Sequence, residues 1–243
     1  MVNLAAYAGV GYSLKHPEKY INTNEVGFFN ILELSRKYKV KKLLYASSSS
    51  IYGTNNLPFR ETQNTDSPLS LYGATKKNNE ILAYYYSRQF KIPTFGIRFF
   101  TVYGPYGRPD LSIFKFCNQI LKNKTLTLYN YGNNFRDFTY IDDLIDSLNK
   151  IIKLKIPSGV NKKLYYLINI SSGNKIKISK LVKLIEKALG KKAKIRLTNK
   201  LSYDIPASLS YSKVLKSLIK IKKNTKIGDG IKKFTNWFQE YYY

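Results

Sequence analysis

The chain has 243 residues, 44% of them hydrophobic, which is enough for one domain or two small ones with a buried core. Its 41 Lys and Arg outnumber its 15 Asp and Glu, giving a formal net charge of +26, but no apolar run is long enough to span a membrane and no basic segment precedes apolar residues as in a signal peptide. One cysteine, Cys117, excludes an internal disulfide and favours a cytoplasmic setting, and with His16 as the only histidine no zinc or other metal site is expected.

Strands and helices alternate through the first hundred residues. Residues 1–6 predict the end of a strand. Gly9 and Gly11 predict a loop and not a dinucleotide-binding fingerprint, whose third glycine would fall at Leu14. The spacing of apolar residues then predicts helices over residues 24–39 and 72–90, strands over residues 41–46 and 94–99, and a polar loop over residues 55–69. This order favours a parallel sheet wrapped by helices.

The rest of the chain predicts shorter elements. Helices are expected over residues 113–121, 179–189 and 229–241, and strands over residues 126–129, 164–170 and 195–197. Residues 136–152 predict a strand that runs into a helix. Gly190 fits the end of the helix before it, because glycine accepts the left-handed conformation found there.

The end of one predicted strand and the start of the next helix carry groups suited to proton transfer. The strand sequence LLYA runs into four consecutive serines, Ser47 to Ser50. Tyr72 lies four residues before Lys76, so the two side chains share one face of a helix. A nearby ammonium lowers the pKa of a phenol from its usual ~10, which makes a tyrosine a usable base near neutral pH. We expect Ser48, Tyr72 and Lys76 to form a catalytic set, although a Tyr-x-x-x-Lys pattern alone is common by chance.

Five stretches of sequence resemble one known family. They are NLAAYAGVGYSLKHPEKYINTNEVGFFNILE, LLYASSSSIYG, SLYGATKKNNE, RFFTVYGPYGRPD and YNYGNNFRDFTYIDDL. Together they cover nearly the whole chain, and they are similar to the bacterial UDP-glucuronate 4-epimerases of the extended short-chain dehydrogenase/reductase superfamily. The resemblance implies an α/β fold, with a Rossmann-like parallel sheet that has helices on both faces and a smaller α/β region that binds the substrate.

The resemblance also implies domain bounds and a reaction. An incomplete NAD-binding domain would span residues 1–105, with residues 138–170 returning to it, and residues 106–137 and 171–243 would bind the nucleotide sugar. NAD would be the cofactor, and a UDP-sugar, most simply UDP-glucuronate converted to UDP-galacturonate, the substrate. Tyr72 would remove the proton of the sugar's 4-hydroxyl while C4 gives a hydride to NAD. The hydride would then return to the other face of the 4-keto sugar.

Site residues follow from the same resemblance. The catalytic positions of the family match Ser48, Tyr72 and Lys76. Its cofactor contacts match Ala5, Ala6, Asn24, Tyr72 and Lys76. Its substrate contacts match Ser49, Ser50, Thr101, Arg108 and Arg136. The two arginines would hold the diphosphate, which guanidinium groups bind bidentately, and a surface salt bridge is the alternative for each of them.

One part of the family pattern is not found in this sequence. The family begins with a strand, a G-x-x-G-x-x-G turn at a helix N-terminus, and a second strand that bears an acidic residue. That turn holds the pyrophosphate of the cofactor. We therefore expect the chain to be a fragment of such an enzyme, with an affinity for NAD weaker than ~10 μM when it is alone.

Other functions stay open at this stage. A 4,6-dehydratase or decarboxylase of the same superfamily would need acidic groups after the catalytic serine, where Ser49 and Ser50 stand, and serine is a poor acid or base unaided. An inactive remnant would bind a nucleotide sugar or nothing. The charge of +26 fits a nucleic-acid binder, but lysines far outnumber the seven arginines, which favours biased composition. We expect no nucleic-acid partner and keep a homodimer open.

Overall fold

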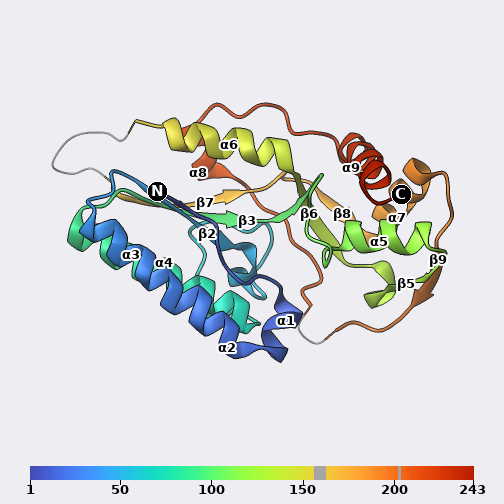
Figure 1. Cartoon of the computed structure of the whole chain (residues 1–243), viewed down its shortest axis with the longest axis horizontal. Helices are drawn as coiled ribbons and strands as arrows, with labels where there is room; N and C mark the ends of the chain where they lie inside the picture. Colours follow the sequence, from blue (N-terminus) through green and yellow to red (C-terminus); the bar gives the residue numbers. More distant parts are fainter. Residues whose placement is uncertain (156–162, 202–203) are drawn as a thin grey trace. The chain divides into compact units, whose positions relative to one another are not determined.

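The computed structural model describes residues 1–155, 163–201 and 204–243, which form two compact units (Figure 1). Unit 1 comprises Met1–Phe99, Asn149–Ile170 and Tyr211–Lys220. Unit 2 comprises Phe100–Leu148, Ser171–Ser210 and Ile221–Tyr243. Each unit is therefore closed by segments that return to it after the chain has passed through the other.

Unit 1 contains a four-stranded parallel sheet in the order β1-β2-β3-β7. Its strands are β1 (Val2–Asn3), β2 (Leu43–Ser48), β3 (Thr94–Phe99) and β7 (Tyr165–Ile170). The strands β2 and β3 are buried along nearly their whole length, as expected for central strands of a parallel sheet with helices on both faces. The parallel sheet with helices on both faces confirms the predicted α/β class.

Two long helices cover one face of this sheet, as Figure 1 shows. They are α3 (Gly27–Lys37) and α4 (Leu71–Phe90). Phe28 and Leu32 of α3 form one buried cluster with Ala83 and Tyr86 of α4, and the cluster reaches Tyr45 of β2. The helix α4 begins after Ser70, whose Oγ accepts a hydrogen bond from the Gly73 amide at 3.1 Å, as an N-cap serine does.

The chain between β1 and α3 is more helical than its sequence predicts. The short helices α1 (Val10–Lys15) and α2 (Pro17–Tyr20) lead through a π-helical stretch, Ile21–Val26, into α3. The predicted loop at Gly9–Gly11 was therefore wrong beyond Gly9, which has a φ of 114° and immediately precedes α1. Two glycines in three residues argue against a helix locally, and tertiary contacts of Ser13 and Tyr20, described below, outweigh that preference.

The opposite face of the sheet is covered by returning segments (Figure 1). The helix α8 (Lys213–Leu218) packs on β7 and buries Leu215. The helix α6 (Ile141–Lys153) ends in unit 1, where Lys42 Nζ donates to the carbonyl oxygens of Ile151 at 3.1 Å, Ile152 at 2.9 Å and Leu154 at 2.6 Å. A cation at a helix C-terminus satisfies carbonyl groups that have no partner within the helix.

Among its described residues, unit 2 contains two small sheets, three amphipathic helices and the part of α6 up to Leu148. The strands β4 (Thr101–Tyr103), β6 (Phe135–Tyr140) and β8 (Lys175–Lys177) form one sheet, and β5 (Thr125–Leu128) pairs with β9 (Lys194–Leu197). The helices are α5 (Ser112–Leu121), α7 (Ile178–Leu189) and α9 (Ile227–Tyr242). Phe114, Cys117, Ile185, Phe234 and Phe238 lie at the centre of one shared core.

The two units differ from the predicted domain bounds in three segments. Residues 100–105 and 138–148 fall in unit 2, because β6 pairs with β4 on one side and with β8 on the other. Residues 211–220 fall in unit 1, because α8 packs on β7. The sequence could not show the last of these returns, since α8 is only six residues long.

Candidate active site

The serine run at the end of β2 forms a tight turn. Ser48 is buried, and its Oγ accepts a hydrogen bond from the Ser50 amide at 3.1 Å, which starts a single 3-10 turn over Ser49–Tyr52. Its hydroxyl hydrogen is left for donation. A Cβ on Gly73 would lie only 2.8 Å from the Ser50 carbonyl oxygen, so glycine at this position lets the first turn of α4 pack directly on the serine turn. The hydroxyl groups and the start of α4 are thereby held together.

Tyr72 lies in that first turn of α4 and is half-buried. Its backbone amide donates to Ser13 Oγ of α1 at 3.4 Å, and its ring meets the edge of the Tyr20 ring at 6.1 Å between centroids. Tyr20 in turn donates its hydroxyl to the Gly9 carbonyl at 2.8 Å. The unpredicted helix α1 therefore contributes to the position of the predicted base.

Lys76 lies one turn further along α4 and is only 3% exposed. Its Nζ donates to the Ala46 carbonyl at 2.9 Å and lies 6.0 Å from the centre of the Tyr72 ring. Burial lowers the pKa of this ammonium to about 8, so it is still mostly charged at pH 7. An ammonium has three donors, and Ala46 takes one of them, so donors are available for a ligand next to Tyr72.

Asn24 was predicted to contact the cofactor, and the structure gives its amide a bracing role. Its Oδ1 accepts from the Tyr7 amide at 2.8 Å, while its Nδ2 donates to the Tyr7 carbonyl at 3.0 Å and to Thr75 Oγ1 at 3.1 Å. These bonds tie the segment after β1, which includes Ala5 and Ala6, to α4. Direct contact of Asn24, Ala5 and Ala6 with a cofactor stays a prediction.

A buried charge network that the sequence did not reveal lies next to this site. Glu80, one turn beyond Lys76, accepts from Arg98 Nε at 2.9 Å and from Arg98 Nη2 at 2.7 Å. Their side chains are 4% and 2% exposed. Glu80 also accepts from Ser47 Oγ at 2.6 Å, and Arg98 Nη1 donates to the Tyr52 hydroxyl at 2.8 Å. Burial opposes the charge on Arg98, but Glu80 and Tyr52 more than offset it and raise its pKa.

This network joins three elements around the serine turn. Arg98 belongs to β3, Glu80 to α4 and Ser47 to β2, and Tyr52 is the last residue of the turn itself. Tyr52 extends the network by donating to Asn169 Oδ1 of β7 at 2.7 Å. In the sequence, the one indication that Glu80 lies near the site is its position one helical turn after Lys76. This spacing places both side chains on the face of α4 that meets β2.

The other predicted substrate residues, Thr101, Arg108 and Arg136, lie in unit 2, and both arginines pair with a carboxylate. Exposed Arg108 donates from Nε to Asp110 Oδ1 at 2.9 Å. Arg136 pairs with Asp204 and donates from Nη1 to the Phe135 carbonyl at 2.8 Å, and burial lowers its pKa. Thr101 is half-buried at the start of β4. The salt-bridge alternative is thus present at both arginines, and a diphosphate contact stays a prediction.

Asp137 follows Arg136 on β6 and is fully buried. Its carboxylate accepts from the amides of Ser172 at 2.9 Å, Gly173 at 3.1 Å and Ser210 at 3.4 Å, and from Ser172 Oγ at 2.7 Å. Burial raises its pKa to about 6, and these hydrogen bonds limit the rise. The carboxylate fixes two loops beside Arg136, a role that the sequence did not indicate.

Two features are absent from the described part of the chain. Residues 1–155, 163–201 and 204–243 contain no group of three or more His, Cys, Asp or Glu side chains arranged to hold a metal ion. Among those same residues, no helix combines the length and apolar character needed to cross a membrane.

The sequence matches one family model and a large set of curated proteins. Residues 1–161 match the model described as the NAD dependent epimerase/dehydratase family. Protein CapI of Staphylococcus aureus is 43% identical over 256 aligned residues, which span 100% of this chain and 76% of that protein. A UDP-glucuronate 4-epimerase of Thermodesulfobacterium geofontis is 40% identical, over 99% of this chain and 72% of that protein.

Solved structures agree with these matches. The UDP-glucuronic acid 4-epimerase of Bacillus cereus, in complex with UDP-glucuronic acid and NAD, superposes with a TM-score of 0.90. It is 29% identical in sequence, and the superposition covers 98% of this chain and 74% of that one.

Proposed function

The chain belongs to the NAD-dependent epimerase/dehydratase family, and from that premise we propose that it epimerises C4 of UDP-glucuronate to give UDP-galacturonate through a 4-keto sugar. The observation that carries the proposal is the buried ammonium of Lys76, held 6.0 Å from the Tyr72 ring beside the serine turn. Relatives named UDP-glucuronate 4-epimerase and the Bacillus cereus complex support this choice of substrate.

The chain's own groups suit both proton steps. Tyr72 takes the proton of the sugar's 4-hydroxyl and later returns it to the oxygen of the 4-keto sugar. The Ser48 oxygen already accepts a hydrogen bond from the Ser50 amide, so the Ser48 hydroxyl hydrogen is available and donates to that same sugar oxygen. The Lys76 cation favours the phenolate form of Tyr72. Ser49 and Ser50 stand where a dehydratase would need acidic groups, which favours epimerisation over elimination.

The residues next to Tyr72 fit the nicotinamide end of NAD. Lys76 has ammonium donors beyond the one that Ala46 accepts, and its Nζ lies 6.0 Å from the centre of the Tyr72 ring, so a ribose hydroxyl bound next to Tyr72 could accept them. Ala5 and Ala6 follow β1 with side chains small enough to let a ligand approach the backbone. NAD, when bound, supplies the hydride acceptor and donor for C4.

The direct test is conversion of UDP-glucuronate in the presence of NAD. The 243-residue chain is assayed beside a fusion in which the glycine-rich start of a UDP-glucuronate 4-epimerase precedes Met1. Chromatography should show UDP-galacturonate approaching equilibrium with UDP-glucuronate. The proposal would be contradicted if neither protein, folded and saturated with NAD, converted UDP-glucuronate to UDP-galacturonate or UDP-galacturonate to UDP-glucuronate.

Changing Lys76 to methionine should move the pH dependence of that activity. Without the cation, the pH at which activity rises should shift upward, toward the ~10 of a free phenol. The measurement is a pH–rate profile of the variant against its parent. Lys77→Met is the matched control, because Lys77 Nζ bonds to Thr65 Oγ1 and to Asp66 on the loop side of the same helix. A Lys76→Met profile that overlays the control profile would exclude this role for Lys76.

Arg136 and Arg108 are proposed to hold the diphosphate of the substrate. Arg136 uses two of its guanidinium nitrogens for Asp204 and the Phe135 carbonyl, which leaves N–H donors for a phosphate oxygen. Arg136→Ala should weaken UDP binding by roughly 1.5–3 kcal/mol, as expected for a charge-assisted hydrogen bond, and Arg108→Ala should do likewise. Calorimetry with UDP measures both, with the exposed Arg196→Ala as control. Unchanged UDP affinity in both variants would remove them from the site.

We also propose a homodimer in the cytoplasm. The neighbouring helices α3 and α4 expose Phe29, Ile81 and Tyr85, and Val26 is exposed directly before α3; exposed apolar side chains on adjoining elements are typical of a contact surface. Sedimentation should show a dimer that Phe29→Glu dissociates. The cytoplasmic location is supported by the single, buried Cys117, which cannot form a disulfide within the chain.

A further inference from the structure

The strand β7 is the last strand of the sheet in unit 1, so one of its edges has no neighbouring strand among residues 1–155, 163–201 and 204–243. The register pairs Tyr165 with Thr94, and the Thr94 amide donates to the Leu164 carbonyl at 2.7 Å. In a parallel pair, backbone groups point alternately toward the partner and away from it. Tyr166 and Ile168 therefore turn their amides toward β3. Tyr165, Leu167 and Asn169 turn theirs outward.

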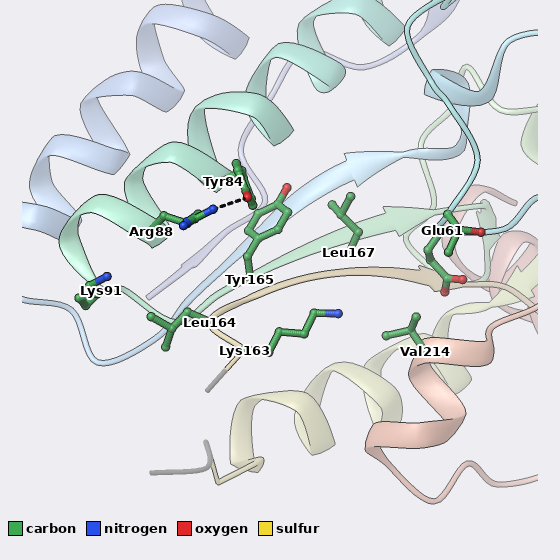
Figure 2. A pocket seen from close by; sticks show the side chains of 10 residues that line it. Glu61, Tyr84, Arg88, Lys91, Lys163, Leu164, Tyr165, Leu167 and Val214 are labelled. Atoms are coloured by element: carbon green, nitrogen blue, oxygen red, sulfur yellow. Dashed lines mark hydrogen bonds between the residues drawn. The ribbon is translucent and has the colours of Figure 1, made fainter. Parts of the chain in front are cut away.

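This outer edge is closed at one end and open at the other. The Asn169 amide donates to Glu61 Oε1 at 3.1 Å. The amides of Tyr165 and Leu167 have no hydrogen-bond partner within the described residues. Both residues line a groove of about 770 Å³, shown in Figure 2. Proteins commonly cover or charge such an edge, since it is a ready template for another strand.

The groove has walls suited to an added strand. Tyr84 and Arg88 of α4 stand on one side of β7, and Val214 of α8 stands on the other (Figure 2). The Tyr84 and Arg88 side chains are joined by a hydrogen bond of 3.1 Å from Nη1 to the phenol oxygen. Leu164 and Leu167 supply apolar surface between the walls. Side chains of an inserted strand would alternate between these two walls.

The charge around the groove is strongly positive. Arg88, Lys91 and Lys163 line it, and Figure 2 shows them along its Leu164 end. Glu61, the acidic lining residue, already accepts a hydrogen bond from Asn169. A ligand that is both extended and acidic would complement the unpaired backbone edge and the three cations.

We propose that the groove along Tyr165–Leu167 binds an extended acidic segment of a partner protein, which pairs with β7 as an additional strand. A second copy of this chain is disfavoured as the occupant, because edge-to-edge pairing would bring the three cations of one copy toward the same three of the other and the whole chain carries a charge of +26. A nucleic acid offers anionic phosphates but no strand-like backbone for the two amides. The proposal is independent of the epimerase reaction, since none of the catalytic candidates lines the groove.

The test uses the 243-residue chain and fluorescent octapeptides of alternating valine and glutamate. Because any polyanion is attracted to a protein of charge +26, the deciding comparison keeps the peptide's charge constant. The control peptide has the same sequence, but the backbone nitrogens of two adjacent central residues are methylated. Successive amides of a strand point to opposite sides, so one of the two methylated nitrogens faces β7 whichever edge of the peptide pairs with it. Fluorescence anisotropy should show that N-methylation raises Kd at least about tenfold, as expected for the loss of backbone hydrogen bonds from the added strand. Hydrogen exchange at the Tyr165 and Leu167 amides should slow when the unmethylated peptide binds.

Protein variants separate the groove from the general positive surface. Arg88→Glu combined with Lys163→Glu should raise Kd for the unmethylated peptide at least about tenfold. Lys183→Glu combined with Lys187→Glu changes the net charge equally on exposed positions of α7 and should have a much smaller effect. Thermal melting verifies that each variant is folded. If the groove variant does not fold, the peptide comparison on the parent chain decides.

Four results would overturn the proposal. The first is equal binding of the methylated and unmethylated peptides. The second is equal weakening by the groove variant and the α7 variant. The third is protection of the Tyr165 and Leu167 amides in the free protein by self-association. The fourth is displacement of the fluorescent peptide by a single-stranded oligonucleotide as effectively as by unlabelled peptide. Any of these would mean that the edge is occupied by a second copy or that the surface attracts polyanions without strand pairing.

Discussion

Replacing Tyr72 by phenylalanine is expected to lower kcat by at least ~10²-fold, the scale of lost general-base catalysis. The Lys76 ammonium lies 6.0 Å from the centre of the Tyr72 ring, and phenylalanine keeps the ring that packs against Tyr20 while removing the oxygen. UDP affinity should barely change, because the proposed diphosphate contacts are Arg108 and Arg136. The measurement is the initial rate of UDP-galacturonate formation, together with calorimetry for UDP, in whichever of the chain and the fusion is active.

The control for this prediction is Tyr38→Phe. Tyr38 follows the last turn of α3 and is well exposed, so removing its hydroxyl should leave kcat and UDP binding as in the parent. A Tyr72→Phe protein with a kcat close to that of Tyr38→Phe would show that another group moves the proton. A joint loss of activity and UDP binding would indicate damage to the fold, which circular dichroism would reveal.

Replacing Glu80 by alanine is expected to be the most destabilising single change in the charge network, lowering the free energy of unfolding by about 3–5 kcal/mol. The change leaves the Arg98 guanidinium buried without its carboxylate, and it removes the acceptor of Ser47. For a protein of this size the loss corresponds to a fall in Tm of roughly 6–20 °C. Urea unfolding and thermal melting measure it.

Two comparisons test the cause. Arg36→Ala breaks the exposed pair between Arg36 and Glu33, whose side chains are 47% and 34% exposed, and should cost about 1 kcal/mol or less. Replacing both buried partners, with Glu80→Leu and Arg98→Met, should recover more than half of the stability lost in Glu80→Ala, because no unpaired charge is left. If Glu80→Ala costs no more than Arg36→Ala, the network does not stabilise the fold as argued.

Local sequence was sufficient for the long elements. The strand over 94–99 was predicted with the bounds that the structure has, and the helix over 72–90 lacks only Leu71 at its start. These segments have periodic apolar residues and clear ends, such as the Ser70 cap. The helix α1 was missed because its six residues follow Gly9 and include Gly11, whereas the contacts that hold this segment in place, from Ser13 and from Tyr20 of α2, are made to Tyr72, which is distant in sequence.

The candidate site likewise has residues that local spacing predicts and residues that depend on contacts between distant segments. Ser48, Tyr72 and Lys76 follow from spacing along a strand end and a helix, and the structure brings Tyr72 and Lys76 together on one face of α4. The Glu80–Arg98 pair could not be predicted, because it forms between a helix and a strand and neither residue signals its partner. Asp137 was missed for the same reason, since its donors Ser172 and Ser210 lie more than thirty residues away in loops.

The interrupted path of unit 1 has a consequence for synthesis on the ribosome. The strand β3 ends at Phe99, but the strand that covers its outer edge begins at Tyr165, after much of unit 2 has emerged. At roughly 5–20 residues per second, the apolar edge of β3 stays uncovered for several seconds during translation. Nascent chains halted in that interval should recruit chaperones or aggregate, whereas chains released beyond Lys220 should not. Arg98, whose charge interrupts the apolar run of β3, limits self-association of the nascent strand during this delay.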